Sequence, residues 1–351
     1  MSATDAEQLM HLPPQLKLRW QHRVLHFRTP AATSRGTLSA RSTYTIVASL
    51  PGSIGYGECC TMPGLLPEPP ETQIANACAL VEQQHSAEPL RDAPSPIRFG
   101  IESALLSVLA QGKPRWETPF TRGEVGLPIH RLVWMADTAT MYRSMQEGIE
   151  QGFTCLKLKV GALPFEQETA LLKQARNAFP HAEIRVDANG AFSPDEATDK
   201  LHQLATIGVN SIEQPIAPGN PAAMQQLCRT SPLPIALDEE LIAHASTPHA
   251  RRLLLETLAP AAIVIKPSLH GGLLAARHWA QLADELGIAW WINSALESSI
   301  GHTALAEWCG QYAPCTLHGL GTGKLFTDDA PANIRLQNNR LYYASAFRTD
   351  S

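Results

Sequence analysis

The sequence predicts an α/β protein whose main part is a barrel of alternating strands and helices, preceded by a smaller α+β domain. From residue 127 onward, short β-rich apolar runs alternate with helical patterns at a period of about 27 residues. The first 100 residues lack this alternation and contain patterns of antiparallel strands instead. The length of 351 residues also exceeds what a single small core accommodates.

Eight candidate strands define the barrel, and about 190 residues of parallel β/α units suit its closure. The strands are expected at 128–135, 154–160, 183–188, 209–214, 234–239, 261–267, 288–294 and, on a weaker pattern, 315–320. The clearest intervening helix lies in SPDEATDKLHQLATIG. There Ser193 is the expected N-cap, Pro194 the first helical residue, Glu196 the capping-box partner and Gly208 the C-cap.

The first domain is expected at residues 1–100, with strands in WQHRVLHFRT and STYTIVASLPG and helices at 71–84 and 99–109. The barrel then spans 101–320. A C-terminal segment, 321–351, contains NIRLQNNRLYYA, whose Asn-Asn turn between β-rich runs predicts a hairpin that returns to pair with the first domain.

Composition excludes several classes of protein. A net charge of −5 gives no indication of a nucleic-acid partner. No apolar run approaches the roughly 20 residues that span a bilayer, and MSATDAEQLMHLPP lacks the pattern of a secretory signal. Seven cysteines without a C-x-x-C pair favour free thiols, no zinc knuckle and a cytoplasmic location.

Ionisable residues recur at the ends of five successive predicted strands, one β/α unit apart. They are Lys159, Asp187, Glu213, Asp238 and Lys266, at intervals of 25 to 28 residues. A single carboxylate in such a place is more often a helix N-cap or a solvated loop residue. Five in phase would surround the carboxyl-end mouth of the barrel, where barrel enzymes hold their catalytic groups.

The segment FTCLKLKV (153–160) adds Lys157 on the same strand face as Lys159. Two such lysines are most often solvated, but beside three clustered acids they indicate a catalytic face. Asp187, Glu213 and Asp238 form an all-oxygen set, which suits Mg²⁺ rather than zinc. Burial, a dication and a neighbouring ammonium would together favour a neutral amine on Lys159, which could then act as a base.

These residues form the motifs K-x-K (157–159), D-x-N (187–189), E-Q-P (213–215), D-E (238–239) and K-P (266–267). The pattern resembles the enolase superfamily, for which a Lys or His base paired with Mg²⁺ and an enediolate is established chemistry. Lysines on both sides resemble the muconate-lactonising subgroup, and the seventh strand lacks the His of the mandelate-racemase type. The resemblance implies a modified TIM barrel, (β/α)7β, with an α+β capping domain built from the N-terminal region and the C-terminal tail.

Three stretches are similar to the o-succinylbenzoate synthase family: WWINSALESSIGHTALAEW, HGLGTGKLFTDD and the expected capping loop YGECCTMPGL. This resemblance implies Mg²⁺-dependent dehydration of 2-succinyl-6-hydroxy-2,4-cyclohexadiene-1-carboxylate in menaquinone or phylloquinone synthesis, with Mn²⁺ able to substitute. Lys159 would be the base, and Lys266 would stay an ammonium that stabilises the enediolate. The implied metal ligands are Asp187, Glu213 and Asp238, and the implied substrate contacts are Lys157, Arg185, Asn189, Ser294 and Gly321.

Alternatives remain open, because the same charged residues serve N-succinylamino-acid racemases, dipeptide epimerases and cycloisomerases. A non-catalytic barrel protein is a further hypothesis, disfavoured because all five charged positions are intact. GLGTG (319–323) is compatible with phosphate binding or with backbone contact to a substrate carboxylate. We interpret Glu297 as a structural buried carboxylate. A small carboxylate is the expected partner, and the sequence gives no oligomeric state.

Overall fold

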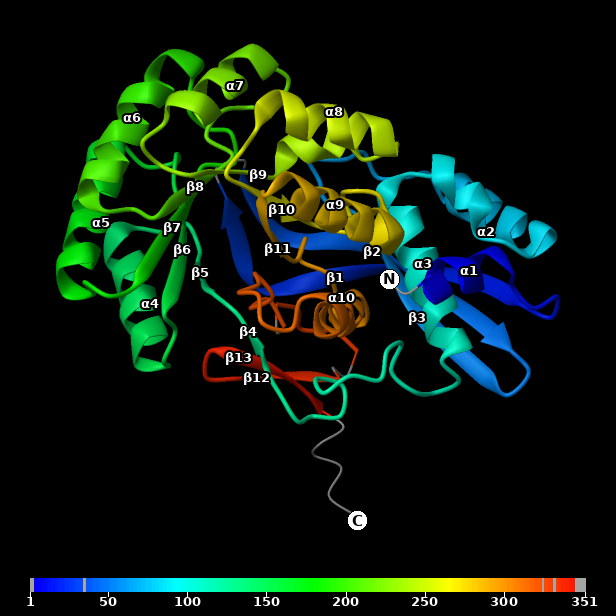
Figure 1. The fold of residues 1–351 in the computed structure, drawn as a ribbon. Helices are drawn as coiled ribbons and strands as arrows, with labels where there is room; N and C mark the ends of the chain where they lie inside the picture. The colour runs from blue at the N-terminus through cyan, green and yellow to red at the C-terminus, as the bar shows by residue number, and fades with distance from the viewer. Residues whose placement is uncertain (1–2, 34–35, 324, 331–332, 345–351) are drawn as a thin grey trace.

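The computed structural model describes residues 3–33, 36–323, 325–330 and 333–344. It combines a curled parallel sheet ringed by helices with a smaller three-stranded sheet that carries its own helices (Figure 1). The α/β barrel with an α+β capping domain is therefore confirmed.

The barrel sheet has seven strands in the order β11-β10-β9-β8-β7-β6-β5, and every neighbouring pair is parallel. Two isolated parallel bridges, Ile129 to His318 and Asn293 to Gly319, join its two edges. The weakly predicted eighth strand, 315–320, is thus represented only by bridges at His318 and Gly319. The strands are β5 (Arg131–Val133), β6 (Cys155–Lys159), β7 (Glu183–Asp187), β8 (Ser211–Glu213), β9 (Ile235–Leu237), β10 (Ala262–Ile265) and β11 (Ala289–Ile292).

Helices follow the strands and curve around the outside of the sheet (Figure 1). Among the described residues, none of the helices combines the length and apolar character needed to cross a membrane. They are α4 (Thr138–Glu150), α5 (Phe165–Ala178), α6 (Pro194–Ile207), α7 (Pro221–Thr230), η2 (Glu239–His244), α8 (Pro248–Leu258), α9 (Gly272–Leu286) and α10 (Ser299–Tyr312).

Helix α6 shows how local sequence sets an element's bounds. It begins at Pro194 and ends before Gly208, whose φ of 90° is the left-handed C-cap expected from the sequence. Its N-terminus differs in one detail. The Ser193 hydroxyl donates to the Glu196 carboxylate at 3.0 Å, and it makes no hydrogen bond to the helix backbone.

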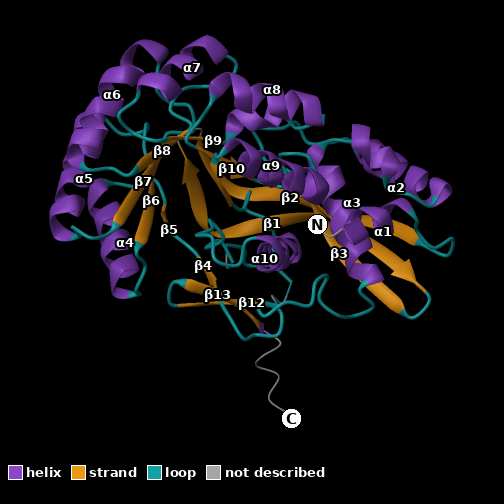
Figure 2. Ribbon diagram, viewed as in Figure 1, coloured by secondary structure: helices purple, strands orange, loops and turns teal. Residues whose placement is uncertain are grey.

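The capping domain is an antiparallel sheet, β1-β2-β3, covered by α3 (Figure 2). The strand β3 was not predicted, and two glycines explain how it packs. A Cβ on Gly57 would lie 1.9 Å from the Gly100 carbonyl oxygen, so only glycine lets strand and helix backbones approach so closely. The elements are α1 (Ala3–Met10), β1 (Lys17–Thr33), β2 (Gly36–Leu50), β3 (Ser53–Cys60), α2 (Glu71–Gln84), η1 (Glu88–Asp92) and α3 (Ser95–Leu109).

The C-terminal hairpin corrects one prediction. Its strands, β12 (Ile334–Gln337) and β13 (Arg340–Tyr343), pair with β4 (Leu127–Pro128) instead of the first domain. The hairpin completes a separate three-stranded sheet because β4 offers an unpaired edge just before the barrel begins. Residues 325–328 do contact the capping domain, through a bridge between Phe326 and Phe27. Residues 345–351 lie outside the described part.

Candidate active site

The charged residues expected at the strand ends lie together at the carboxyl edge of the barrel sheet. Lys159, Asp187 and Glu213 are the last residues of β6, β7 and β8, and the strand register pairs Lys159 with Asp187 and Asp187 with Glu213. Asp238 and Lys266 directly follow β9 and β10. Because parallel strands end on one side of a sheet, the alternating β/α pattern brings all five to one mouth.

Two ammonium groups converge on Asp187. Its Oδ2 lies 2.6 Å from Lys159 Nζ and 3.0 Å from Lys157 Nζ. Lys157 also lies 2.6 Å from Oε2 of Glu213. All four side chains are buried. The two lysines of FTCLKLKV therefore face the barrel interior, and the solvated interpretation of this strand is wrong.

Asn189 links the two halves of the charged cluster. Its Oδ1 accepts a hydrogen bond from Lys159 at 2.8 Å, and its Nδ2 donates to Glu239 at 3.0 Å. Its backbone N–H donates to Asp187 Oδ1, and its φ of 45° lies in the left-handed region that Asn tolerates. On the far side Lys266 donates to Asp238 Oδ2.

Burial opposes charge on each of these groups, and the neighbouring charges decide the outcome. At Asp187 the two lysines outweigh burial and hold the pKa well below its usual range. At Lys266 burial is outweighed by Asp238 and the other acids, so the pKa of Lys266 is raised and it stays an ammonium. At Glu213 burial comes first and the negative Asp187 adds to it, which raises the pKa to about 8.

The donor chemistry of this edge fits a hard divalent cation such as Mg²⁺. Oε1 of Glu213 and Oδ1 of Asp238 are buried and have no hydrogen-bond partner among the described residues. Within the described ranges, however, no three His, Cys, Asp or Glu side chains form a closed ligand group. The metal site is therefore still a prediction.

A cavity of about 310 Å³ adjoins the cluster and lies between the barrel mouth and the capping domain. Lys157, Lys159 and Lys266 line its charged side. Among the expected substrate contacts, Asn189, Ser294 and Gly321 also line it. The capping domain covers it with residues 36–38 and 62–65, so the expected capping loop contributes its last residues.

Arg185 lies elsewhere. Its guanidinium is 4.4 Å from the ring centroid of Trp291, and its Nε donates to Glu183 at 2.7 Å. It precedes Asp187 by two residues on the same strand face, which places it one layer deeper in the barrel. It does not line the cavity, so this geometry lends no support to its predicted contact with substrate.

Sequence reasoning missed the opposite wall of the cavity, formed by His130, Leu132, Trp134 and Asn293. The alternation in PIHRLVWM places the first three on one strand face. That signal was present in the sequence. The pattern alone does not say which face of a strand buried on both sides points into the barrel.

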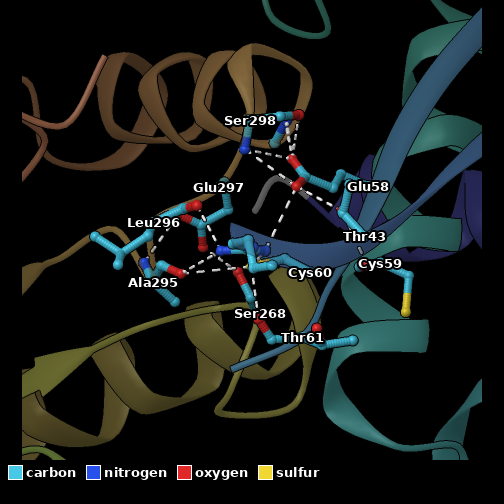
Figure 3. A network of polar contacts seen from close by, with 12 residues as sticks. Thr43, Glu58, Cys59, Cys60, Thr61, Ser268, Ala295, Leu296, Glu297 and Ser298 are labelled. Carbon is cyan, nitrogen blue, oxygen red and sulfur yellow. Dashed lines mark hydrogen bonds and ion pairs between the residues drawn. The ribbon is translucent and has the colours of Figure 1, made fainter. Parts of the chain in front are cut away.

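Glu58 of the capping strand β3 accepts hydrogen bonds from the N-terminus of the barrel helix α10 (Figure 3). Its Oε2 accepts hydrogen bonds from the backbone N–H of Ser298 at 2.8 Å, from the Ser298 hydroxyl at 2.6 Å and from the N–H of Gly301 at 3.1 Å. A carboxylate at a helix N-terminus satisfies donors that the helix itself leaves unpaired. Glu58 therefore joins the capping domain to α10.

Arg41 of β2 holds the loop just before that helix. It is buried, pairs with Glu58 at 3.6 Å and donates to the carbonyl oxygens of Ala295 and Leu296. Leu296 has a φ of 62°, which is strained for a branched side chain. Since Ala295 and Leu296 line the cavity, Arg41 shapes its wall without contacting it.

Glu297 accepts hydrogen bonds from residues of the same loop. Its Oε2 accepts from the Ser294 hydroxyl at 2.6 Å and from the Ala295 N–H at 2.8 Å, and its Oε1 accepts from Ser268 (Figure 3). The side chain of Ser294 is thereby oriented by a buried carboxylate. These contacts agree with the structural interpretation of Glu297.

A family model described as "Enolase C-terminal domain-like" matches residues 140–339. The o-succinylbenzoate synthase of Desulfotalea psychrophila is 37% identical over 364 residues, covering 93% of this chain and 98% of the relative. The crystal structure of MenC from Desulfotalea psychrophila LSv54 superposes with a TM-score of 0.82 at 35% identity, covering 93% of this chain and 99% of that one.

More distant relatives catalyse other reactions. The N-succinylamino acid racemase of Thermus thermophilus is 29% identical, over 61% of this chain and 58% of the relative. A dipeptide epimerase from Cytophaga hutchinsonii, solved with Mg and a dipeptide, shares the fold with a TM-score of 0.80 at 20% identity over 93% of each chain. From the family match and the full-length likeness, the chain is an enzyme of the enolase superfamily, within its muconate-lactonising subgroup.

Proposed function

We propose that this enzyme is an o-succinylbenzoate synthase that dehydrates 2-succinyl-6-hydroxy-2,4-cyclohexadiene-1-carboxylate to 2-succinylbenzoate, on the route to menaquinone or phylloquinone. The supporting observation is the pair of lysines, Lys159 and Lys266, on either side of a buried set of carboxylates beside the cavity. The likeness over 93% of the chain to a relative of this activity supports the choice of substrate.

In the proposed reaction, Lys159 Nζ as the neutral amine takes the proton from the ring carbon that bears the carboxylate. The electron pair of that C–H bond moves into the enediolate, whose negative charge faces the Lys266 ammonium. The C–O bond to the ring hydroxyl then breaks, and the proton held on Lys159 leaves with the hydroxide as water. Atoms and charge balance, and the product ring is aromatic.

The proposed ligands of Mg²⁺, or of Mn²⁺ in its place, are Asp187, Glu213 and Asp238. A bound dication would supply a counter-charge for the substrate carboxylate as its negative charge grows. Lys157 contacts two of these acids and would limit their mutual repulsion. Asn189, Ser294 and Gly321 are proposed to contact the substrate because they line the cavity.

A second candidate is an N-succinylamino-acid racemase or dipeptide epimerase. The observation that favours it is that Lys159 and Lys266 approach the cluster from opposite sides, as a reaction with one base on each face of a carbon requires. The relatives that are racemases and epimerases agree with it.

The test generates the cyclohexadiene substrate enzymatically in situ and follows the loss of its diene absorbance. A panel of N-succinyl amino acids and dipeptides is assayed in parallel for deuterium exchange at the α-carbon. We expect dehydration to dominate, to stop with chelator and to recover with Mg²⁺ or Mn²⁺. Exchange that rivals dehydration would favour the second candidate, and dehydration that survives complete metal removal would contradict the proposed metal.

A further inference from the structure

The cavity wall opposite the acidic cluster contains a second polar group of residues. The acids end strands in the middle of the seven-stranded sheet, whereas β5 and β11 are its two edges. His130 lies just before β5 and Asn293 just after β11, and the bridges at Ile129–His318 and Asn293–Gly319 bring these edges together. Closing the sheet in this way lets both side chains line the cavity next to each other, on strands other than those that carry Asp187 and Glu213.

Both side chains are buried and line the cavity, where they lie beside each other and Asn293 acts on His130 as a side-chain hydrogen-bond partner. His130 is 3% exposed and Asn293 is 4% exposed. Among the described residues, neither ring nitrogen of His130 nor Oδ1 of Asn293 has a partner of ordinary hydrogen-bond geometry. Buried polar groups are nearly always hydrogen-bonded, so two such side chains facing one cavity require a reason.

The other buried histidines of the described chain show what a structural histidine looks like here. His318 accepts or donates at both nitrogens, His270 accepts from the backbone N–H of Lys266, and His302 contacts the Leu320 carbonyl. Each is tied to backbone through at least one ring nitrogen. His130 differs from all three, and it alone among them lines the cavity.

Gly319 accounts for the close approach of the two side chains. A Cβ at this position would lie 2.0 Å from Asn293 Oδ1 and 2.7 Å from His130 Nε2. Any larger residue would therefore displace the polar atoms of both. The absence of a side chain at position 319 leaves these atoms beside each other at the cavity wall.

The charge state of His130 limits what it can bind. Burial, followed by the positive charges of Lys157 and Arg185, holds the pKa of His130 well below its usual range, while the side-chain hydrogen bond with Asn293 acts in the other direction. The ring is therefore neutral, with one N–H to donate. A neutral imidazole N–H beside a carboxamide suits a carbonyl-type oxygen acceptor.

We infer that His130 and Asn293 bind a carbonyl-type oxygen on the part of the substrate that points away from the acids. This inference rests on the proposed function: with the ring carboxylate at the acidic cluster, the oxygen belongs to the succinyl side chain. Either its ketone or its terminal carboxylate supplies such an acceptor. The two residues thus determine substrate specificity and take no part in proton transfer.

The test compares ligands as well as proteins. Wild type, His130→Phe, Asn293→Leu and the control Glu117→Gln are titrated calorimetrically, in Mg²⁺, with 2-succinylbenzoate. The same proteins are titrated with 2-(3-carboxypropyl)benzoate, which lacks the ketone, and with 2-butanoylbenzoate, which lacks the terminal carboxylate. His130→Phe keeps a ring but no N–H, and Glu117→Gln changes an exposed residue that does not line the cavity.

We expect each polar variant to bind 2-succinylbenzoate about 3–10-fold more weakly, as expected for one neutral hydrogen bond. One analogue should bind wild type and variants equally, and that analogue identifies the contacted oxygen. In the dehydration assay KM should rise more than kcat falls, and His130→Gln, which restores an N–H donor, should recover part of the loss.

Some results would contradict this inference alone, and another would also contradict the proposed function. Equal loss of affinity for all three ligands would indicate a structural role only, and unchanged affinity in both variants would exclude any contact. If wild type itself neither binds 2-succinylbenzoate nor dehydrates the cyclohexadiene, the proposed function fails and this inference fails with it. Wild-type turnover with unaffected variants would overturn this inference alone.

Discussion

Lys159 and Lys266 differ in their surroundings although both are buried lysines that meet a carboxylate. Lys159 is shared between Asp187 and the neutral amide of Asn189. Lys266 faces Asp238 with other acids nearby, and their charges raise its pKa against the effect of burial. In the proposed reaction Lys159 is the base, and Lys266 is the permanent cation.

We therefore predict that Lys159→Met lowers the dehydration rate by about 10²–10⁴-fold, the usual contribution of a general base. Binding of 2-succinylbenzoate should persist, because the cavity keeps its other polar residues. Rates are measured in the in situ assay and binding by calorimetry. The control is Lys200→Met, on the outer helix α6, which should react at the wild-type rate. Wild-type turnover by Lys159→Met would contradict the assignment.

At this scale the sequence predicted the charged residues well and the neutral ones poorly. Asp187, Glu213 and Lys266 follow apolar strands at one regular interval, so their position in phase could be recognised. Arg185 shares a strand face with Asp187, and only the depth of each layer in the barrel separates them. His130 and Asn293 belong to no charge pattern, and only the folded chain brings them together at the cavity wall.

At the scale of elements, two charged side chains of the capping domain hold the loop between β11 and α10. Arg41 donates to two successive carbonyls of that loop and pairs with Glu58, which in turn caps α10. Both charged side chains are almost completely buried. Removing one partner would leave the other charge unpaired in a low-dielectric site.

We predict that Arg41→Met destabilises the protein by about 3–5 kcal/mol, as breaking a buried ion pair usually does. Measured by urea unfolding, Arg41→Lys should lose most of this stability too, since an ammonium cannot reach both carbonyls in the same way. The KM of the surviving enzyme should rise, because Ala295 and Leu296 line the cavity.

The matched control is Arg91→Met, which removes an exposed pair with Glu88 and should cost at most about 1 kcal/mol. Equal unfolding midpoints for the two arginine variants would show that the buried pair contributes nothing beyond a surface contact.

Sequence periodicity located elements better than it located their partners. Trp290 and Trp291 illustrate the success, because neighbouring residues of the expected strand 288–294 point to opposite faces of the sheet. The Trp291 ring packs against the guanidinium of Arg185 in the barrel interior. The ring centroid of Trp290 lies 6.2 Å from that of Trp308 in α10. The hairpin β12–β13 illustrates the failure, since its pairing with β4 depends on which sheet edge is free after the chain has folded.

In the whole molecule, a second capping-domain carboxylate caps a barrel helix. Glu102 of α3 accepts from the backbone N–H groups of Leu273 and Leu274, at 2.6 and 3.1 Å, in the first turn of α9. Burial raises its pKa from the usual 4.5 to about 7, although Arg98, those two N–H groups and Arg251 act in the other direction. Desolvation therefore exceeds the stabilisation that its partners provide.

The raised pKa of Glu102 makes the stability of the folded protein decrease as pH rises. The folded protein holds the Glu102 proton more tightly than the unfolded chain, so stability from this group is full below pH 4.5 and is lost as pH rises to about 7. At about 1.4 kcal/mol per pKa unit, the rise from 4.5 to about 7 corresponds to a loss of at most about 3.5 kcal/mol. Glu102→Gln keeps an acceptor and cannot ionise, so it should not lose this stability. The difference in urea unfolding midpoint, variant minus wild type, should therefore increase from pH 5 to pH 8.

The control is Glu117→Gln on the exposed surface, whose midpoint difference from wild type should be flat over the same range. A Glu102→Gln difference that decreases with pH would mean that the ionised carboxylate stabilises α9, contrary to this prediction.

The contact between Gly57 and Gly100 limits where this enzyme can be recombined with its relatives. A chimera with a crossover between these positions would join a strand from one parent to a helix from another. Any Cβ at either glycine would force the two backbones apart. Glu58 lies beside Gly57 and would be carried away from Ser298, so the damage would reach α10 of the barrel. Crossovers between Leu109 and Leu127 avoid this, because they exchange β3 and α3 as one block.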